Sequence, residues 1–157
     1  MTMHVARVHV IEFDGPVERV LPLFTPEGEE AWADGWAPEY LHPATKKTCR
    51  DMVFRTRHGG EETLWACVDW DPANGTTRYV RVTPGSRMGF VKVECRAIDA
   101  GRTRATVSYD LTALTDRGKQ VLAELTDAAF RDMIDGWQAK ISAHLKNAPM
   151  RADDSAH

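Results

Sequence analysis

The chain has 157 residues, 43% of them hydrophobic, and its 20 basic and 23 acidic side chains leave a net charge of −3. This length predicts one domain that folds without disulfides, and the balanced charge excludes the basic surface that nucleic acid or an anionic membrane requires. The sequence has no apolar run of about 18 residues and no signal-like segment. Its three widely spaced cysteines suit free thiols in a reducing compartment, so we expect a cytoplasmic protein without stable membrane insertion.

The first predicted elements are one strand and two short helices. The segment "HVARVHVIEF" at 4–13 alternates, which predicts a strand. Its apolar face would carry Ala6, Val8 and Val10, opposite Arg7 and His9. Capping and proline signals then predict helices at about 16–22 and 26–34, followed by a short extended segment at 36–42.

Five further strands are predicted between residues 51 and 114, because alternating runs there are separated by turns rich in Gly, Asn, Asp and Pro. Counting hydrophobic residues on each face predicts that Phe54, Trp70, Val80, Val82, Val91, Val93 and Tyr109 point inward. The same count places Arg81 on the outer face. It also places Trp65 outside, which is unusual for tryptophan, and a β-bulge in that strand would reverse the assignment.

A single long helix is predicted from Asp116 to about Lys146. Apolar residues recur there every three or four positions, and Thr115 can cap the start. Gly118 and Gly136 are interior weak points. Residues 148–157 are polar and small, which predicts a disordered tail after a single domain at 1–147.

This order of elements predicts an α+β fold. The helix must bury its apolar stripe and the sheet one of its faces. A curved seven-stranded antiparallel sheet wrapped around the long C-terminal helix, with two short helices after the first strand, satisfies both.

A family resemblance agrees with this fold. The segments "LFTPEGEEAWADGW", "PEYLHP", "VFRTRHGG", "TLWACVDWDP", "RYVRVTPG" and "LTALTDRGKQVLAELT" resemble the START/Bet v1-like (SRPBCC) superfamily, in particular a bacterial branch labelled polyketide cyclase/dehydrase-like. The resemblance implies the helix-grip fold. That superfamily includes lipid carriers, hormone receptors, polyketide cyclases and chaperone-activator domains. It has no shared catalytic signature, so no residue role is carried over.

The aromatic segment 23–43 predicts a ligand pocket between the sheet and the helix. Tryptophan and tyrosine offer flat apolar contacts with an N–H or O–H to orient a ligand. The alternative for each aromatic residue is simple core packing. The predicted ligand-binding residues are Trp36, Tyr40, Phe54, Trp70, Val82, Val93, Tyr109, Phe130, Met133 and Trp137, with Trp32 as a further possibility.

No motif for chemistry stands out. The six histidines show no metal-ligand spacing, and nucleophile and phosphate-loop motifs are absent, so we expect no metal and no cofactor. If catalysis occurs, acid–base chemistry within the pocket is favoured. The candidates are Tyr109, Tyr40, His58 and Asp69, each of which also suits a structural or solvated role.

Three functions remain open. The first is binding or transport of a small hydrophobic ligand, such as a lipid, polyketide or aromatic metabolite. The second is a cyclase or dehydratase that acts on such a molecule, which needs a titratable group deep in the pocket. The third is a protein-interaction module similar to chaperone activators, seeded by an outward Trp65. The sequence suits a monomer or a homodimer.

Overall fold

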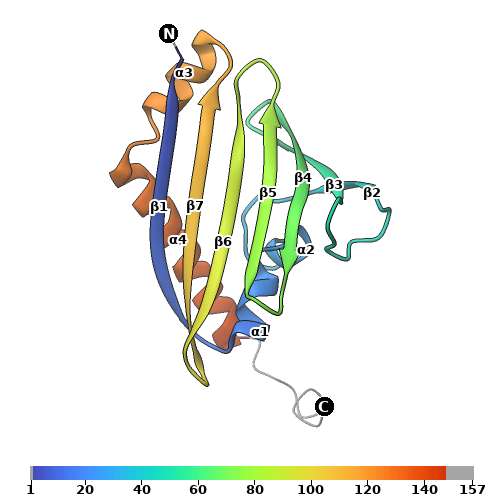
Figure 1. Cartoon of the computed structure of the whole chain (residues 1–157), viewed down its shortest axis with the longest axis vertical. Helices are drawn as coiled ribbons and strands as arrows, with labels where there is room; N and C mark the ends of the chain where they lie inside the picture. The colour runs from blue at the N-terminus through green and yellow to red at the C-terminus, as the bar shows by residue number, and fades with distance from the viewer. Residues whose placement is uncertain (1, 148–157) are drawn as a thin grey trace.

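The computed structural model describes residues 2–147, so the predicted tail at 148–157 lies outside the described residues. Seven antiparallel strands form one sheet in the order β1-β7-β6-β5-β4-β3-β2 (Figure 1), as predicted. The strands are β1 (His4–Asp14), β2 (Glu39–His42), β3 (Val53–His58), β4 (Glu61–Asp71), β5 (Thr76–Thr83), β6 (Arg87–Asp99) and β7 (Arg102–Ala113).

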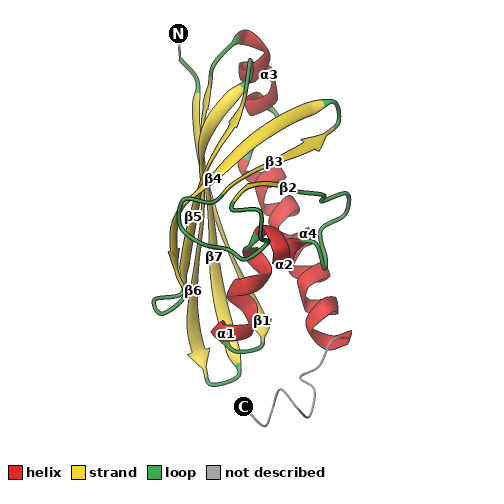
Figure 2. Cartoon of the chain, turned by 90° about the vertical axis from the view of Figure 1, so that its right-hand side faces the viewer, coloured by secondary structure: helices red, strands yellow, loops and turns green. Residues whose placement is uncertain are grey.

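The helices lie on one side of the sheet. Figure 2 shows α4 (Asp127–Asn147) running along that side. The short elements after β1 are α1 (Val17–Val20), η1 (Leu21–Phe24) and α2 (Pro26–Glu29). This arrangement confirms the predicted α+β helix-grip architecture. Among the described residues, no helix is both long enough and apolar enough to cross a membrane.

The prediction of one continuous C-terminal helix is wrong. The segment forms α3 (Asp116–Ala123) and α4, which are separated by residues 124–126. The Thr126 hydroxyl accepts a hydrogen bond from the Ala129 N–H at 3.1 Å and caps the start of α4. Arg7 donates from Nε to the Leu125 carbonyl oxygen at 2.9 Å. The apolar spacing continues through the break, so periodicity could not reveal it.

The predicted faces of β1 are reversed. Val8 and Val10 are 62% and 45% exposed on the outer face, whereas Ile11 is buried. His9 faces α4 instead, and its Nε2 lies 2.7 Å from Asp135 Oδ1. Polar residues can occupy the inner face of β1 because α4 presents polar partners to this edge strand.

The predicted faces of β5 are also reversed. Tyr79 and Thr83 are buried and Arg81 lines an internal cavity, so Val80 and Val82 occupy the outer face, where they are half-buried. The first half of β4 is reversed in the same way, so Trp65 points inward. The register shift between Cys67 and Asp69 then returns Trp70 to the inner face, as predicted. The predictions for Phe54, Val91, Val93 and Tyr109 are confirmed.

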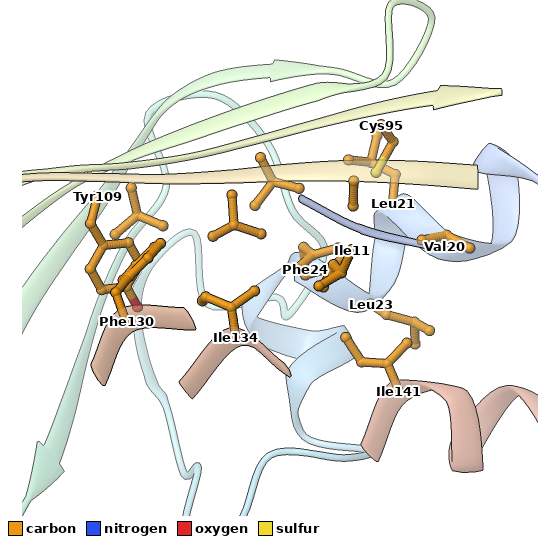
Figure 3. Packing of buried hydrophobic residues seen from close by; sticks show 14 of the residues in the cluster. Ile11, Val20, Leu21, Leu23, Phe24, Cys95, Tyr109, Phe130, Ile134 and Ile141 are labelled. Atoms are coloured by element: carbon orange, nitrogen blue, oxygen red, sulfur yellow. The ribbon is translucent and has the colours of Figure 1, made fainter. Parts of the chain in front are cut away.

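The space between sheet and helix is filled by a hydrophobic core over part of its length. Figure 3 shows Ile134 and Ile141 of α4 under the sheet, on the side that faces Phe24 and Leu23 of η1. Tyr109 and Phe130 lie side by side, with ring centroids 5.1 Å apart. Beyond them, toward β3 and β4, the side chains leave a cavity.

Candidate ligand-binding cavity

An internal cavity of about 260 Å³ lies between α2, the turn that follows it, strands β3–β7 and α4. Its mouth is bordered by exposed residues of the turn and of the end of β3, namely Asp34, Gly35, Arg57 and His58. The inner wall combines many aromatic side chains with a few polar ones. This is the composition of small-molecule sites, in which apolar walls supply contact area and a few polar groups set orientation.

The aromatic wall is rigid. The rings of Phe54 and Trp65 stack with centroids 5.6 Å apart and an interplanar angle of 6°, and Trp36 meets both edge-on. On the other side, the ring centroids of Trp32 and Trp137 lie 5.8 Å apart. These contacts hold the rings in place, so a flat ligand meets a preformed surface.

Three indole N–H groups of this wall, those of Trp32, Trp36 and Trp65, are used within the protein. Trp32 donates from Nε1 to the Leu23 carbonyl oxygen at 2.8 Å, and Trp36 donates to the Pro26 carbonyl oxygen at the same distance. Trp65 donates to the Thr56 hydroxyl at 3.0 Å. These three N–H groups are therefore not free to bind a ligand.

Arg81 places a cation deep in the cavity. Its guanidinium carbon lies 4.7 Å from the Trp65 ring centroid, in a cation–π contact. Burial lowers the pKa of Arg81, and its Nε is buried without a hydrogen-bond partner among the described residues. Arginine begins from so high a pKa that it keeps its charge. An unpartnered N–H on a desolvated cation favours an acceptor oxygen.

The Glu61 carboxylate, which also lines the cavity, already has a partner. Arg87 donates to both oxygens of Glu61 at 3.2 Å, and Arg117 approaches the same carboxylate at 3.7 Å. The hydrogen bonds from Arg87, and then the charges of Arg87 and Arg117, hold the pKa of Glu61 below its usual value. Among the described residues no carboxylate forms an ion pair with Arg81, whose guanidinium instead interacts with the Tyr109 hydroxyl.

Two tyrosine hydroxyls are further polar groups in the lining of the cavity. Burial raises the pKa of Tyr109 to about 12, an effect that the neighbouring Arg81 reduces. Burial also raises the pKa of Tyr79, whose hydroxyl makes no hydrogen bond of normal geometry to any described residue. The Thr77 hydroxyl interacts weakly with it but donates to the Asp69 carbonyl oxygen. Both phenols are protonated at neutral pH and can donate to a ligand.

Glu29 places a carboxyl group in the cavity. A tight turn positions it, since the Thr25 hydroxyl accepts from the Gly28 N–H at 3.0 Å and a Cβ at Gly28 would overlap the Pro22 carbonyl oxygen. Burial raises the pKa of Glu29 to about 8. The carboxyl is therefore mostly protonated at neutral pH. A pKa this close to neutral allows a group both to give and to take a proton.

The structure brings together about half of the predicted residues. Trp36, Phe54, Val93, Tyr109, Trp137 and the catalytic candidate His58 line the cavity, and Met133 lines a neighbouring chamber. Tyr40, Trp70, Val82 and Phe130 lie outside the lining. Tyr40 instead donates to Glu30 Oε2 at 2.8 Å. Asp69 faces away and pairs with Arg50 at 3.4 Å.

Sequence reasoning missed the main polar groups, which are Glu29, Tyr79, Arg81 and Arg87, and also the position of Trp65. The one available signal was the unusual outward placement of Trp65. Trp65 and Arg81 are paired in register across β4 and β5, so reversing one strand reverses both residues. Within the described chain, no three His, Cys, Asp or Glu side chains are grouped to hold a metal ion.

No protein-family model matches the sequence, and no curated protein matches it. Solved structures do match. Norcoclaurine synthase from Thalictrum flavum, in complex with dopamine and hydroxybenzaldehyde, aligns with 11% identity over 96% of this chain and 91% of that chain, with a TM-score of 0.67. Zhui aromatase/cyclase from a Streptomyces species aligns with 19% identity over 99% and 91%, with a TM-score of 0.54.

A protein of uncharacterised function from Rhizobium leguminosarum also matches, with 12% identity, coverage of 94% of this chain and 99% of that chain, and a TM-score of 0.58. At such identities the likeness concerns the fold. The matches extend over nearly the whole chain and agree with its sheet order and C-terminal helix. The chain has a helix-grip fold, the fold that the START/Bet v1-like (SRPBCC) resemblance implies.

Proposed function

We propose that this protein binds a small, largely aromatic molecule that carries one anionic or strongly polarised oxygen group, such as a carboxylate or an enolisable ketone. The observation that supports this most directly is Arg81, a charged side chain inside an apolar cavity with an unpartnered Nε. A buried N–H donor without an acceptor is costly for a protein to maintain, above all on a charged group. A ligand oxygen would complete its hydrogen bonding.

The charge balance of the cavity favours an acidic ligand. Glu61 and Arg87 neutralise each other, and Glu29 is mostly uncharged below a pH of about 8. The interior therefore has one net positive charge, that of Arg81. An anion is attracted to this site, whereas an amine is repelled.

The walls of the cavity indicate the shape of the rest of the ligand. Stacked Phe54 and Trp65 on one side and Trp137 on the other offer flat apolar surfaces. Norcoclaurine synthase, bound to dopamine and hydroxybenzaldehyde, has the same fold and also holds ring-shaped molecules. An interaction module has less support, because Trp65, its expected seed, lines the cavity.

Paired fluorescent probes test this proposal. Anilinonaphthalene sulfonate and N-phenylnaphthylamine are similar aromatic molecules, of which only the first is anionic. We expect both to bind. Arg81→Met keeps the length of the side chain and removes its charge, so it should weaken the sulfonate by about tenfold to a hundredfold, the range of one charged hydrogen bond. The neutral probe should change by less than about threefold.

Arg78→Met is the matched control. Arg78 belongs to the same strand but lies on the outer face, over the Phe90 ring at 4.0 Å. This variant removes the same charge without touching the cavity, so both probes should keep their affinities. Equal losses of both probes in Arg81→Met, or no binding of either probe to the wild type, would contradict the proposal.

A second function, acid–base catalysis on the bound molecule, is favoured by Glu29. A carboxyl group with a pKa of about 8 can act as a base once ionised. Arg81 and Tyr109 would stabilise the oxygen of the enolate formed when Glu29 removes a proton from the carbon beside a carbonyl. If the ligand carries a second carbonyl, the enolate carbon can attack it to form a carbon–carbon bond, and the resulting alkoxide takes the proton back from Glu29 and becomes a hydroxyl, which is the aldol step of a cyclisation.

Deuterium exchange tests this second function. In heavy water, ionised Glu29 would take a methyl proton from acetonaphthone, exchange it with solvent and return a deuteron. NMR should show protein-catalysed loss of the methyl signal, with a rate that rises with pH and levels off above about pH 8. Glu29→Gln should remove this catalysis and leave N-phenylnaphthylamine binding in place. Exchange that is equally fast with Glu29→Gln excludes Glu29 as the base.

A further inference from the structure

A second chamber of about 250 Å³, open to solvent beside the exposed Glu124, adjoins the cavity on the side of α3. Arg81, Arg87 and Tyr109 line both spaces and stand between them. The other lining residues are mainly aliphatic and come from β7, α3, the break between the helices, and α4. They are Leu111, Val121, Leu122, Glu124, Leu125 and Met133.

The break between α3 and α4 builds this chamber. It allows α3 to leave the line of α4 and to pack at the end of the sheet, near the top of Figure 2. The start of α3 is fixed there, since the Thr115 hydroxyl donates to the Gly85 carbonyl oxygen at 2.7 Å and Gly118 lies directly against the Ser86 carbonyl oxygen. The bond from Arg7 to the Leu125 carbonyl oxygen holds the other end.

The two chambers have different linings. Flat aromatic rings surround the main cavity, whereas leucine, valine and methionine surround the second. Rigid rings suit a planar ligand, and flexible aliphatic side chains, methionine above all, adapt to an alkyl chain. Arg81, which touches both spaces, is placed to hold an oxygen group located between two such parts.

We propose that the ligand has two arms that meet at its oxygen group: an aromatic arm in the main cavity and an aliphatic arm of a few carbons in the α3 chamber. This proposal rests on the proposed binding function and specifies the ligand class. Aryl acids with an alkyl branch beside the carboxylate, and ketones with one aryl and one alkyl side, have this shape. A molecule with an aromatic arm alone would leave the second chamber unused.

A series of naphthylacetates tests the proposal. The parent compound carries the aromatic arm and the carboxylate, and its relatives carry a methyl, ethyl, propyl or butyl branch on the carbon between them. Calorimetry should show an affinity that rises by about fourfold for each added methylene, the value for transfer of apolar surface out of water. The rise should stop when the chamber is full.

Leu125→Trp fills the chamber from the helix break. In this variant the ratio of affinities between the propyl compound and the parent should fall to about one. Val8→Trp, a slightly larger enlargement at an exposed site on the outer face, should keep the wild-type ratio. Calorimetry is preferred to fluorescence here because both variants add a tryptophan.

The outcomes separate this inference from the function on which it rests. If the parent binds and Arg81→Met weakens it, but affinity does not rise with branch length, the two-arm ligand is wrong and the binding function stands. A rise that persists in Leu125→Trp also overturns the inference, because the branch then lies elsewhere. If no compound of the series binds, both proposals fail.

Discussion

The guanidinium carbon of Arg81 lies 4.7 Å from the ring centroid of Trp65, inside the cavity. Both residues were predicted to face outward. Their contact explains how a cation is tolerated there, because the aromatic face attracts the charge without neutralising it. A carboxylate partner would have cancelled the charge. The Trp65 ring therefore positions Arg81 and leaves it able to bind a ligand oxygen.

The first prediction concerns Glu29 and pH. Its pKa is raised from 4.5 to about 8 in the folded protein, so the folded state holds a proton that the unfolded state releases. The contribution of Glu29 to stability is therefore full below pH 4.5 and is lost as pH rises toward 8. We expect Glu29→Gln to match the wild type near pH 5. At pH 9 the variant should be more stable than the wild type, because it carries no buried charge. Cavity water screens the charge of Glu29, so we expect a difference on the order of 2 kcal/mol, or roughly 5 °C in Tm.

Glu30→Gln is the control for this measurement, and its sign is opposite. The hydrogen bond from Tyr40 lowers the pKa of Glu30, so its stabilising contribution is present above the unfolded pKa and is lost on acidification. Glu30→Gln should therefore lower Tm at neutral pH and have little effect in acid. Parallel pH profiles for Glu29→Gln and the wild type would show that Glu29 ionises normally.

The second prediction compares two glycines in the C-terminal helices. A Cβ at Gly118 would overlap the Ser86 carbonyl oxygen, so Gly118→Ala must displace α3 and should cost about 1–3 kcal/mol of unfolding free energy. Gly136 is exposed in α4 with nothing close to a Cβ. Gly136→Ala should stabilise by about 0.5–1 kcal/mol through helix propensity. Denaturant unfolding measures both values, and equal effects would contradict the placement of α3.

The third prediction concerns the cysteines. Burial raises the pKa of Cys67 to about 11 and that of Cys95 to about 12, whereas Cys49 is half-buried. Thiolate is the reactive form, so the two buried thiols should react with a disulfide reagent at pH 8 on the order of a hundredfold more slowly than Cys49. One of the three thiols should titrate rapidly in the native protein, and all three in denaturant. Rapid reaction of native Cys49→Ser would disprove this.

Much of the fold could be predicted because it depends on repeated local signals. Turn residues at hairpin spacing indicated five strands, and the apolar period indicated the final helix. The break before Thr126 was missed because Leu122, Leu125 and Ala129 keep the same spacing across it. Tertiary contacts from Arg7 hold that break, and such a contact between distant parts of the chain has no local signal.

The cavity was predicted less well for a physical reason. The inward face of each strand was assigned by counting apolar residues, which placed Val80 and Val82 inside. In β5 the cavity takes the face with Tyr79 and Arg81, so the hydrophobic rule fails at the proposed site. Such conflicts between local pattern and structure are expected where function is placed above stability. The Val91–Val93 part of β6, which has no polar cavity residue, followed the rule. β1 did not, because α4 offers polar partners to its inner face.

The most direct test of the account is NMR of the Arg81 Nε–H, assigned by its loss in Arg81→Lys. This proton has no protein partner in the described structure. Adding naphthylacetate should move its signal strongly downfield and slow its exchange with water, because a charged hydrogen bond forms. Naphthylacetate that binds while the Arg81 signal stays unchanged, or that does not bind at all, would contradict the account.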